Sequence, residues 1–190
     1  MKRKYLLQAA LLLSGLLCTP FSTAANAQEH GAHTHGEADV LIILESTSLF
    51  ITLESPAVNL LGFEHAPHTN KQKQLAKEVV AKLQKAEHFF AITPACVLKN
   101  NSVDFPFELE NTSTHHVSTN GNHTSKEHHH DVSLNVEWQC KRTKKLEIDI
   151  KIFEEFKGFN SITAQWIAFD RQNAAKLNKH NSVVILEPAQ

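Results

Sequence analysis

The stretch that decides the fold reads Glu37-Ala-Asp-Val-Leu-Ile-Ile-Leu-Glu45, and Leu49-Phe-Ile-Thr-Leu53 follows it closely. Apolar side chains recur at every second position in both segments, which is the pattern of a strand with one buried face. The polar residues Ser46-Thr-Ser48 between them predict a turn. The two segments therefore predict a β-hairpin.

Later segments repeat this alternation. Strands are predicted at Val132–Cys140, Leu146–Ile150, Ile162–Ala168 and Val183–Leu186. Two shorter candidates are Ala95–Leu98 and Val103–Leu109, the second of which is interrupted by a proline.

One segment has helical periodicity. Residues Thr69–Glu87 carry apolar side chains at helical spacing, and Thr69 with Gln72 has the sequence of a capping box. The preceding residues, 54–67, have no clean period and predict an ordered connection, while Phe153–Phe159 predicts a turn or short helix. The expected class is α+β: a mainly antiparallel sheet of about six to seven strands, with one long amphipathic helix packed on it.

The first residues have the three parts of a secretory signal peptide. The basic start Lys2-Arg-Lys4 precedes an apolar run, Leu6–Leu17, and Ala25-Asn-Ala27 supplies small residues for a cleavage site. The run is shorter than the roughly 20 residues that span a bilayer. We expect cleavage after Ala27, export to the periplasm, and one mature domain, Gln28–Gln190, without a membrane span.

Two cysteines, Cys96 and Cys140, remain after this processing. An even number of cysteines in an exported chain predicts one disulfide, because the periplasm is oxidising. The alternative is that both thiolates bind zinc, although neither lies in a C-x-x-C or C-x-x-H spacing.

The chain contains 13 histidines, and most fall into three groups. The mature N-terminus holds His30, His33 and His35. The second group, His65 and His68, precedes the predicted helix. The third lies in a segment of Asn, Thr, Ser and Gly at about residues 111–131 and consists of His115, His116, His123, His128, His129 and His130. This segment predicts a disordered loop, because it has too little apolar surface to offset the entropy lost on ordering.

Histidine-rich tracts are typical of metal binding, because a neutral imidazole offers a nitrogen lone pair to Zn²⁺, Cu²⁺ or Ni²⁺. His33 and His35 face the same side of an extended chain and could chelate one ion. Zinc takes about four ligands, so others must come from elsewhere. His65 is the best candidate, and Glu64 could supply an oxygen ligand or a hydrogen bond to a ligating imidazole. His65 could instead be a hydrogen-bonded structural residue, and the N-terminal histidines could be inert.

Other function classes are less favoured. Cleavage after Ala27 would place His30 third in Gln28-Glu-His30, an arrangement that binds Cu²⁺ or Ni²⁺ in a square plane, so copper or nickel buffering is the alternative function. An enzyme such as a metallohydrolase is not expected, since the sequence has no H-E-x-x-H or G-x-S-x-G motif. The net acidic mature chain has no basic patch for nucleic acid.

The assembled residues resemble a known family. His30-Gly-Ala-His-Thr-His-Gly36 resembles the opening of the ZrgA-like periplasmic zinc-binding proteins, and Glu54-Ser-Pro-Ala-Val-Asn-Leu-Leu-Gly-Phe-Glu-His-Ala-Pro67 resembles their most recognisable block. A mid-chain His-rich insertion, a strand ending in a cysteine and Phe153-Glu-Glu-Phe-Lys-Gly-Phe159 are also similar. The resemblance covers essentially the whole mature chain.

This resemblance implies a periplasmic component of zinc acquisition that works with an inner-membrane ABC-type transporter. It also implies that the N-terminal His motif, His65 and the loop are metal-binding regions. We expect a higher-affinity site made of the N-terminal histidines and His65, with the loop capturing ions weakly nearby.

Overall fold

The predicted hairpin is the centre of the larger sheet. In the computed structural model, which describes residues 34–109 and 130–188, β1 (Glu37–Glu45) pairs antiparallel with β2 (Ser48–Pro56). Their register places Ile42 opposite Ile51, and both side chains are almost completely buried. The period-two alternation of the sequence therefore sets which face of the hairpin meets the core.

The hairpin belongs to a six-stranded sheet of order β4-β5-β2-β1-β7-β8. The other four strands are β4 (Val97–Asp104), β5 (Asp131–Gln139), β7 (Ser161–Ala168) and β8 (Arg171–Leu177). Strands β1 and β7 are parallel, whereas the other neighbours are antiparallel. The prediction of an antiparallel sheet is corrected here to a mixed sheet, because alternation reports burial and carries no information on strand direction.

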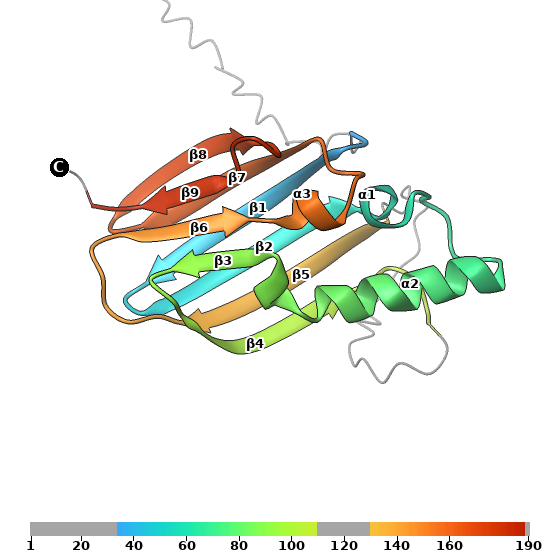
Figure 1. The fold of residues 1–190 in the computed structure, drawn as a ribbon, viewed down its shortest axis with the longest axis horizontal. Coiled ribbons are helices and arrows are strands. Elements are labelled where there is room, and N and C mark those ends of the chain that lie inside the picture. Colours follow the sequence, from blue (N-terminus) through green and yellow to red (C-terminus); the bar gives the residue numbers. More distant parts are fainter. Residues whose placement is uncertain (1–33, 110–129, 189–190) are drawn as a thin grey trace, which may run out of the picture. The chain divides into compact units, whose positions relative to one another are not determined.

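A second, three-stranded sheet has the order β3-β6-β9 and consists of β3 (Phe90–Thr93), β6 (Leu146–Ile150) and β9 (Val183–Leu186). Figure 1 shows this sheet and the helices on one face of the six-stranded sheet. The core between the layers includes Leu53, Leu134, Ile148 and Ile162, each at most 2% exposed. One face of each sheet is therefore apolar and buried.

The main helix, α2 (Asn70–Leu83), begins where the sequence predicts. Thr69 and Gln72 form the capping box, but the helix ends before the predicted Glu87. Its end is fixed from β4, since the Asn101 side-chain amide donates hydrogen bonds to the carbonyls of Leu83 and Gln84 at 3.3 and 2.7 Å. A 3₁₀ turn, Ala86–His88, follows.

Two short helices complete the described residues. The segment predicted as a connection, residues 54–67, contains the end of β2 and helix α1 (Ala57–Leu61), which ends at Gly62 in a left-handed conformation. A single turn is too short for helical periodicity to be read in the sequence. Helix α3 (Ile152–Glu155) occupies part of the predicted turn or short helix.

The described residues form nine strands, more than the predicted six to seven. Strand β3 is only four residues long, and β8 is exposed at most positions, so neither shows a clear alternation. The predicted strand Val103–Leu109 is wrong, because β4 already covers Val103 and ends at Asp104, before Pro106. Proline lacks the N–H that would continue the ladder.

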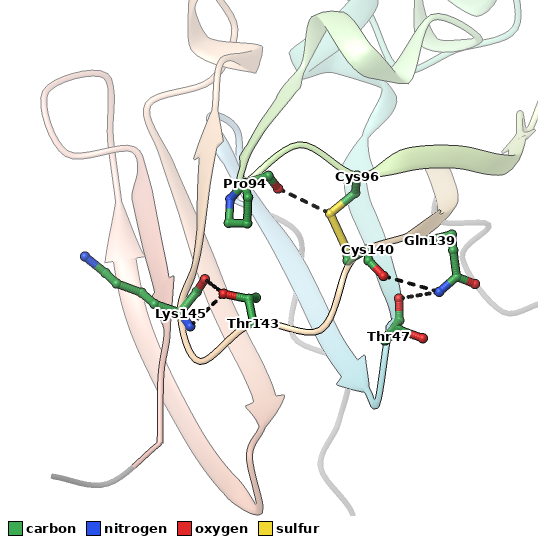
Figure 2. Close-up of a disulfide and its surroundings, with 7 residues drawn as sticks. All are labelled: Thr47, Pro94, Cys96, Gln139, Cys140, Thr143 and Lys145. Carbon is green, nitrogen blue, oxygen red and sulfur yellow. Dashed lines mark hydrogen bonds between the residues drawn. A yellow bond between two sulfur atoms is a disulfide. The ribbon is translucent and has the colours of Figure 1, made fainter.

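The predicted disulfide between Cys96 and Cys140 is present, with the two Cα atoms 4.3 Å apart (Figure 2). It joins the start of β4 to the end of β5. The backbone N–H of Cys140 and the side-chain amide of Gln139 both donate to the Thr47 carbonyl, at 2.8 and 3.0 Å. These bonds tie the disulfide to the β1–β2 turn.

A disulfide is compatible with an exported protein. Among the described residues, no helix is both long enough and apolar enough to cross a bilayer.

Candidate metal centre

The buried side chain of Asn59 connects α1 to the segment that carries the N-terminal histidines. Its oxygen accepts a hydrogen bond from the Gly36 N–H at 2.7 Å. Its amide nitrogen donates to the Glu37 carbonyl at 2.8 Å and to the Ser55 hydroxyl at 3.1 Å. Asn59 and Ser55 are the only buried polar side chains in the described residues. Buried polar groups need such partners, so this network fixes the chain entering β1 against α1.

Two glycines allow this close approach. Gly36 has a φ of +87°, and a Cβ there would collide with the side chain of Asn160. A Cβ at Gly158 would collide with the backbone carbonyl of Asn59. The backbone N–H groups of Asn160 and Ser161 both donate to the Gly36 carbonyl, at 2.7 and 3.0 Å. The start of β1 is therefore held from two sides.

We call these contacts of Asn59, Asn160 and Ser161 with the chain entering β1 the clamp. The clamp leaves His35 beside Glu64. The Nε2 atom of His35 lies 2.7 Å from a carboxylate oxygen of Glu64, and both side chains are at least half exposed. A neutral imidazole that donates from Nε2 shares its proton with the carboxylate, and a metal ion can replace a proton held between two such ligands. Glu64 is thus in direct contact with the His35 ring.

His65 is held differently. Its Nδ1 donates to the backbone carbonyl of Ala66 at 2.8 Å, so in the neutral ring the lone pair is on Nε2. The ring stacks between Phe63 and His68, with centroids 5.0 and 5.1 Å away. A backbone carbonyl bonded to one nitrogen is the arrangement that orients a histidine for metal binding through the other.

His130 is the member of the third group that the structure describes. Its backbone carbonyl accepts a hydrogen bond from the N–H of Ala57, the first residue of α1, at 2.9 Å. Its ring packs on Phe107 at a centroid distance of 4.9 Å. His130 is therefore part of the described structure, whereas residues 111–129 of the predicted loop lie outside the described residues.

One described histidine from each group is thus linked to α1: His35 through Gly36 and Asn59, His65 through the chain leaving α1, and His130 through Ala57. Within residues 34–109 and 130–188, no group of three or more His, Cys, Asp or Glu side chains is arranged to hold a metal ion. The other predicted ligands lie outside the described residues and stay predictions: His30, His33, His115, His116, His123, His128 and His129.

One ion pair stabilises the clamp electrostatically. The Lys176 ammonium on β8 lies 2.7 Å from the Glu37 carboxylate, which also accepts a bond from the Ser161 hydroxyl at 3.4 Å. The hydrogen bond and charge of Lys176 lower the pKa of Glu37 below its ordinary value of 4.5.

A family model described as "ZrgA family zinc uptake protein" matches residues 32–186, which include the whole clamp and the segments bearing His35, His65 and His130. The chain belongs to the ZrgA family of zinc uptake proteins. Membership of the ZrgA family indicates a zinc-related role. A search among curated proteins returned no match.

Sequence reasoning missed the residues that position the histidines. Asn59, Ser55 and Gly158 bind no metal themselves, and a lone Asn in an irregular segment gives no periodic signal. A usable signal was the polar Asn59 between Val58 and Leu60, because a polar residue in an apolar run needs hydrogen-bond partners once it is buried.

Proposed function

We propose that this protein captures Zn²⁺ in the periplasm through its histidines and assists uptake of the ion by an ABC-type transport system. Family membership supports the zinc-related part of the proposal. The disulfide is consistent with an oxidising compartment.

One observation carries the proposal: histidine-bearing segments that are far apart in the sequence are anchored to the same short helix. Asn59 of α1 holds the residue after His35, and Ala57 of α1 holds the carbonyl of His130. Two positions on one five-residue helix thus hold the chain next to His35 and at His130, at the same end of the sheet.

The His35–Glu64 pair would provide the first two ligands. Two ligands of a tetrahedral zinc ion at about 2.0–2.1 Å are about 3.3 Å apart. The pair is 2.7 Å apart now, so a separation of about 0.6 Å would admit an ion in place of the shared proton. The remaining ligands would come from His65, from His30 or His33, or from the histidines between residues 115 and 129.

The role proposed is binding rather than catalysis. An exposed carboxylate–imidazole pair that exchanges a proton for an ion suits reversible capture, because metal and protons compete for the same ligand atoms. The histidines between residues 115 and 129, which belong to the same chain, would raise the local concentration of zinc.

Calorimetric titration of the mature chain with Zn²⁺ tests the proposal. We expect tight binding at pH 7.5, at least ten-fold weaker binding in His35→Gln and Glu64→Gln, and unchanged binding in the control His180→Gln. His180 is exposed and makes no side-chain contact in the described part of the chain.

A second variant, lacking residues 111–129 but retaining His130, distinguishes the higher-affinity site from the weak sites expected in the deleted segment. It should lose the weak sites and keep the tight one. Loss of all binding would mean that the folded pair contributes no site. Competition with Cu²⁺ and Ni²⁺ at equal concentrations distinguishes zinc capture from copper or nickel buffering.

A further inference from the structure

The six-stranded sheet has one face that no described element covers. The helices and the three-stranded sheet lie together on its other face (Figure 1). On the uncovered face Leu41, Phe50 and Ile167 are 42%, 37% and 43% exposed. They are three of the seven large apolar side chains that are exposed in the described residues.

The exposed side chains are neighbours. The register places Ile43 of β1 directly opposite both Phe50 of β2 and Ile167 of β7, and Leu41 lies two residues before Ile43 on the same face. We call Leu41, Ile43, Phe50 and Ile167 the outer patch. Contiguous apolar surface of this kind marks interaction sites, whereas single exposed apolar residues are ordinary.

The sequence of β1 also indicates that both faces of this strand are covered. Residues Val40–Leu44 are apolar without a break. A strand with one face in water alternates, whereas a strand covered on both faces reads as a continuous apolar run. Val40 and Ile42 fill the core, so Leu41 and Ile43 are the additional apolar positions. They fit a strand whose second face is also covered.

Carboxylates flank the outer patch on β1, β2 and β5. Asp39 of β1 stands directly opposite Glu54 of β2, a pairing of like charges that costs stability. Glu137 stands opposite Phe50, and Glu45 ends β1. None of these four carboxylates forms an ion pair within residues 34–109 and 130–188. An apolar centre with a charged rim has the composition of a protein–protein interface.

We propose that this face binds a partner protein whose surface has an apolar centre flanked by lysines or arginines. Charge selects this occupant: a second copy of the chain would place the same carboxylates against each other, and an anionic membrane would repel them. Residues 110–129 of the chain itself contain only one bulky apolar residue, Val117, and so offer little to bury.

This inference goes beyond zinc binding and does not depend on it. Leu41, the patch residue on β1 nearest to Glu37, lies four residues along the strand from it, about 13 Å at the rise of a strand. A partner on the outer patch therefore leaves the His35–Glu64 pair accessible, and variants of the patch should bind zinc normally.

Site-specific photo-crosslinking in intact source cells tests the proposal. A photoreactive residue replaces Ile167 in the full chain, and a matched control replaces Val183 on β9, which is also 43% exposed. We expect a crosslinked protein from position 167, no such product from position 183, and at least five-fold less product when Glu54→Lys and Glu137→Lys are added. Glu87→Lys, an exposed charge reversal away from the sheet, should leave the product unchanged.

Several outcomes overturn the proposal. A product of twice the chain's mass indicates a second copy, and an intrachain product indicates the chain's own segment. Co-sedimentation of the purified chain with vesicles of phosphatidylglycerol and phosphatidylethanolamine, abolished by Leu41→Lys but not by Ile185→Lys, indicates a membrane surface. Equal crosslinking from positions 167 and 183 shows that the outer patch is not a specific binding surface. A product insensitive to charge reversal shows that the carboxylates do not select the partner. Far-UV circular dichroism and zinc titration of each variant confirm that the fold and the metal site persist.

Discussion

The side-chain oxygen of Asn59 accepts a hydrogen bond from the backbone N–H of Gly36 at 2.7 Å, and Gly36 directly follows His35. A residue of a one-turn helix thus fixes the position of a histidine 24 residues earlier in the sequence. Several consequences of this relationship can be measured.

Replacing Asn59 should destabilise the fold and weaken zinc binding together. Asn59→Ala removes three hydrogen bonds and leaves the buried N–H of Gly36 without a partner, which we expect to cost about 2–4 kcal/mol in urea unfolding. The control Asn173→Ala removes an exposed side chain on β8 and should change stability by less than about 0.5 kcal/mol. Equal effects of the two variants would show that the Asn59 network is not a stabilising clamp.

Three glycine variants separate backbone strain from collision. Gly62→Ala meets open space but keeps a φ of +81°, so only strain of about 1–2 kcal/mol is expected. Gly158→Ala collides with the Asn59 carbonyl, and Gly36→Ala combines a collision with a φ of +87°. Denaturant unfolding should rank Gly36→Ala as the most destabilising. If Gly62→Ala is as damaging as Gly158→Ala, close packing against Asn59 does not matter.

Breaking the disulfide should have a large effect on stability without changing zinc affinity at temperatures where the chain is folded. Cys96 and Cys140 are separated by 44 residues, and closing a loop of that length stabilises by about 4 kcal/mol in the chain-entropy description. The double variant Cys96→Ser/Cys140→Ser should show this loss in unfolding experiments. The wild type in reducing agent is the matching control, and an unchanged midpoint in both would contradict the prediction.

Acid should weaken the Glu37–Lys176 pair. Because Lys176 lowers the pKa of Glu37 in the folded protein, the stabilisation is fully present above the ordinary value of 4.5 and is lost as pH falls below it. Stability measured from pH 6 to pH 3 should therefore fall less steeply in Glu37→Gln than in the wild type. Glu45→Gln, which removes an exposed carboxylate without an ion pair in the described residues, should retain the wild-type slope.

Strands with one buried face could be predicted from the sequence, because alternation at Ala38, Val40 and Ile42 directly reports burial. Strand direction could not be predicted, so the parallel pairing of β1 with β7 came only from the structure. Strand β8 is exposed at most positions and α1 is only one turn long, so neither has a detectable period.

The candidate site was predictable in composition and only partly in geometry. Imidazoles and carboxylates are recognisable by type, so His35, Glu64 and His65 could be named in advance. That His35 contacts Glu64, while His65 stacks on Phe63 and His68, depends on the backbone path around Asn59. That path is set by tertiary hydrogen bonds between segments distant in sequence, which no local pattern encodes.

The most direct test of the central claim is a crystal structure of the mature protein soaked in Zn²⁺, with anomalous scattering measured on both sides of the zinc absorption edge. The account predicts an anomalous peak about 2.0–2.1 Å from an imidazole nitrogen of His35, with Glu64 within the coordination sphere or bonded to the ligating ring. A fully zinc-loaded protein in which His35 and Glu64 keep their direct hydrogen bond, with every zinc peak elsewhere, would contradict it.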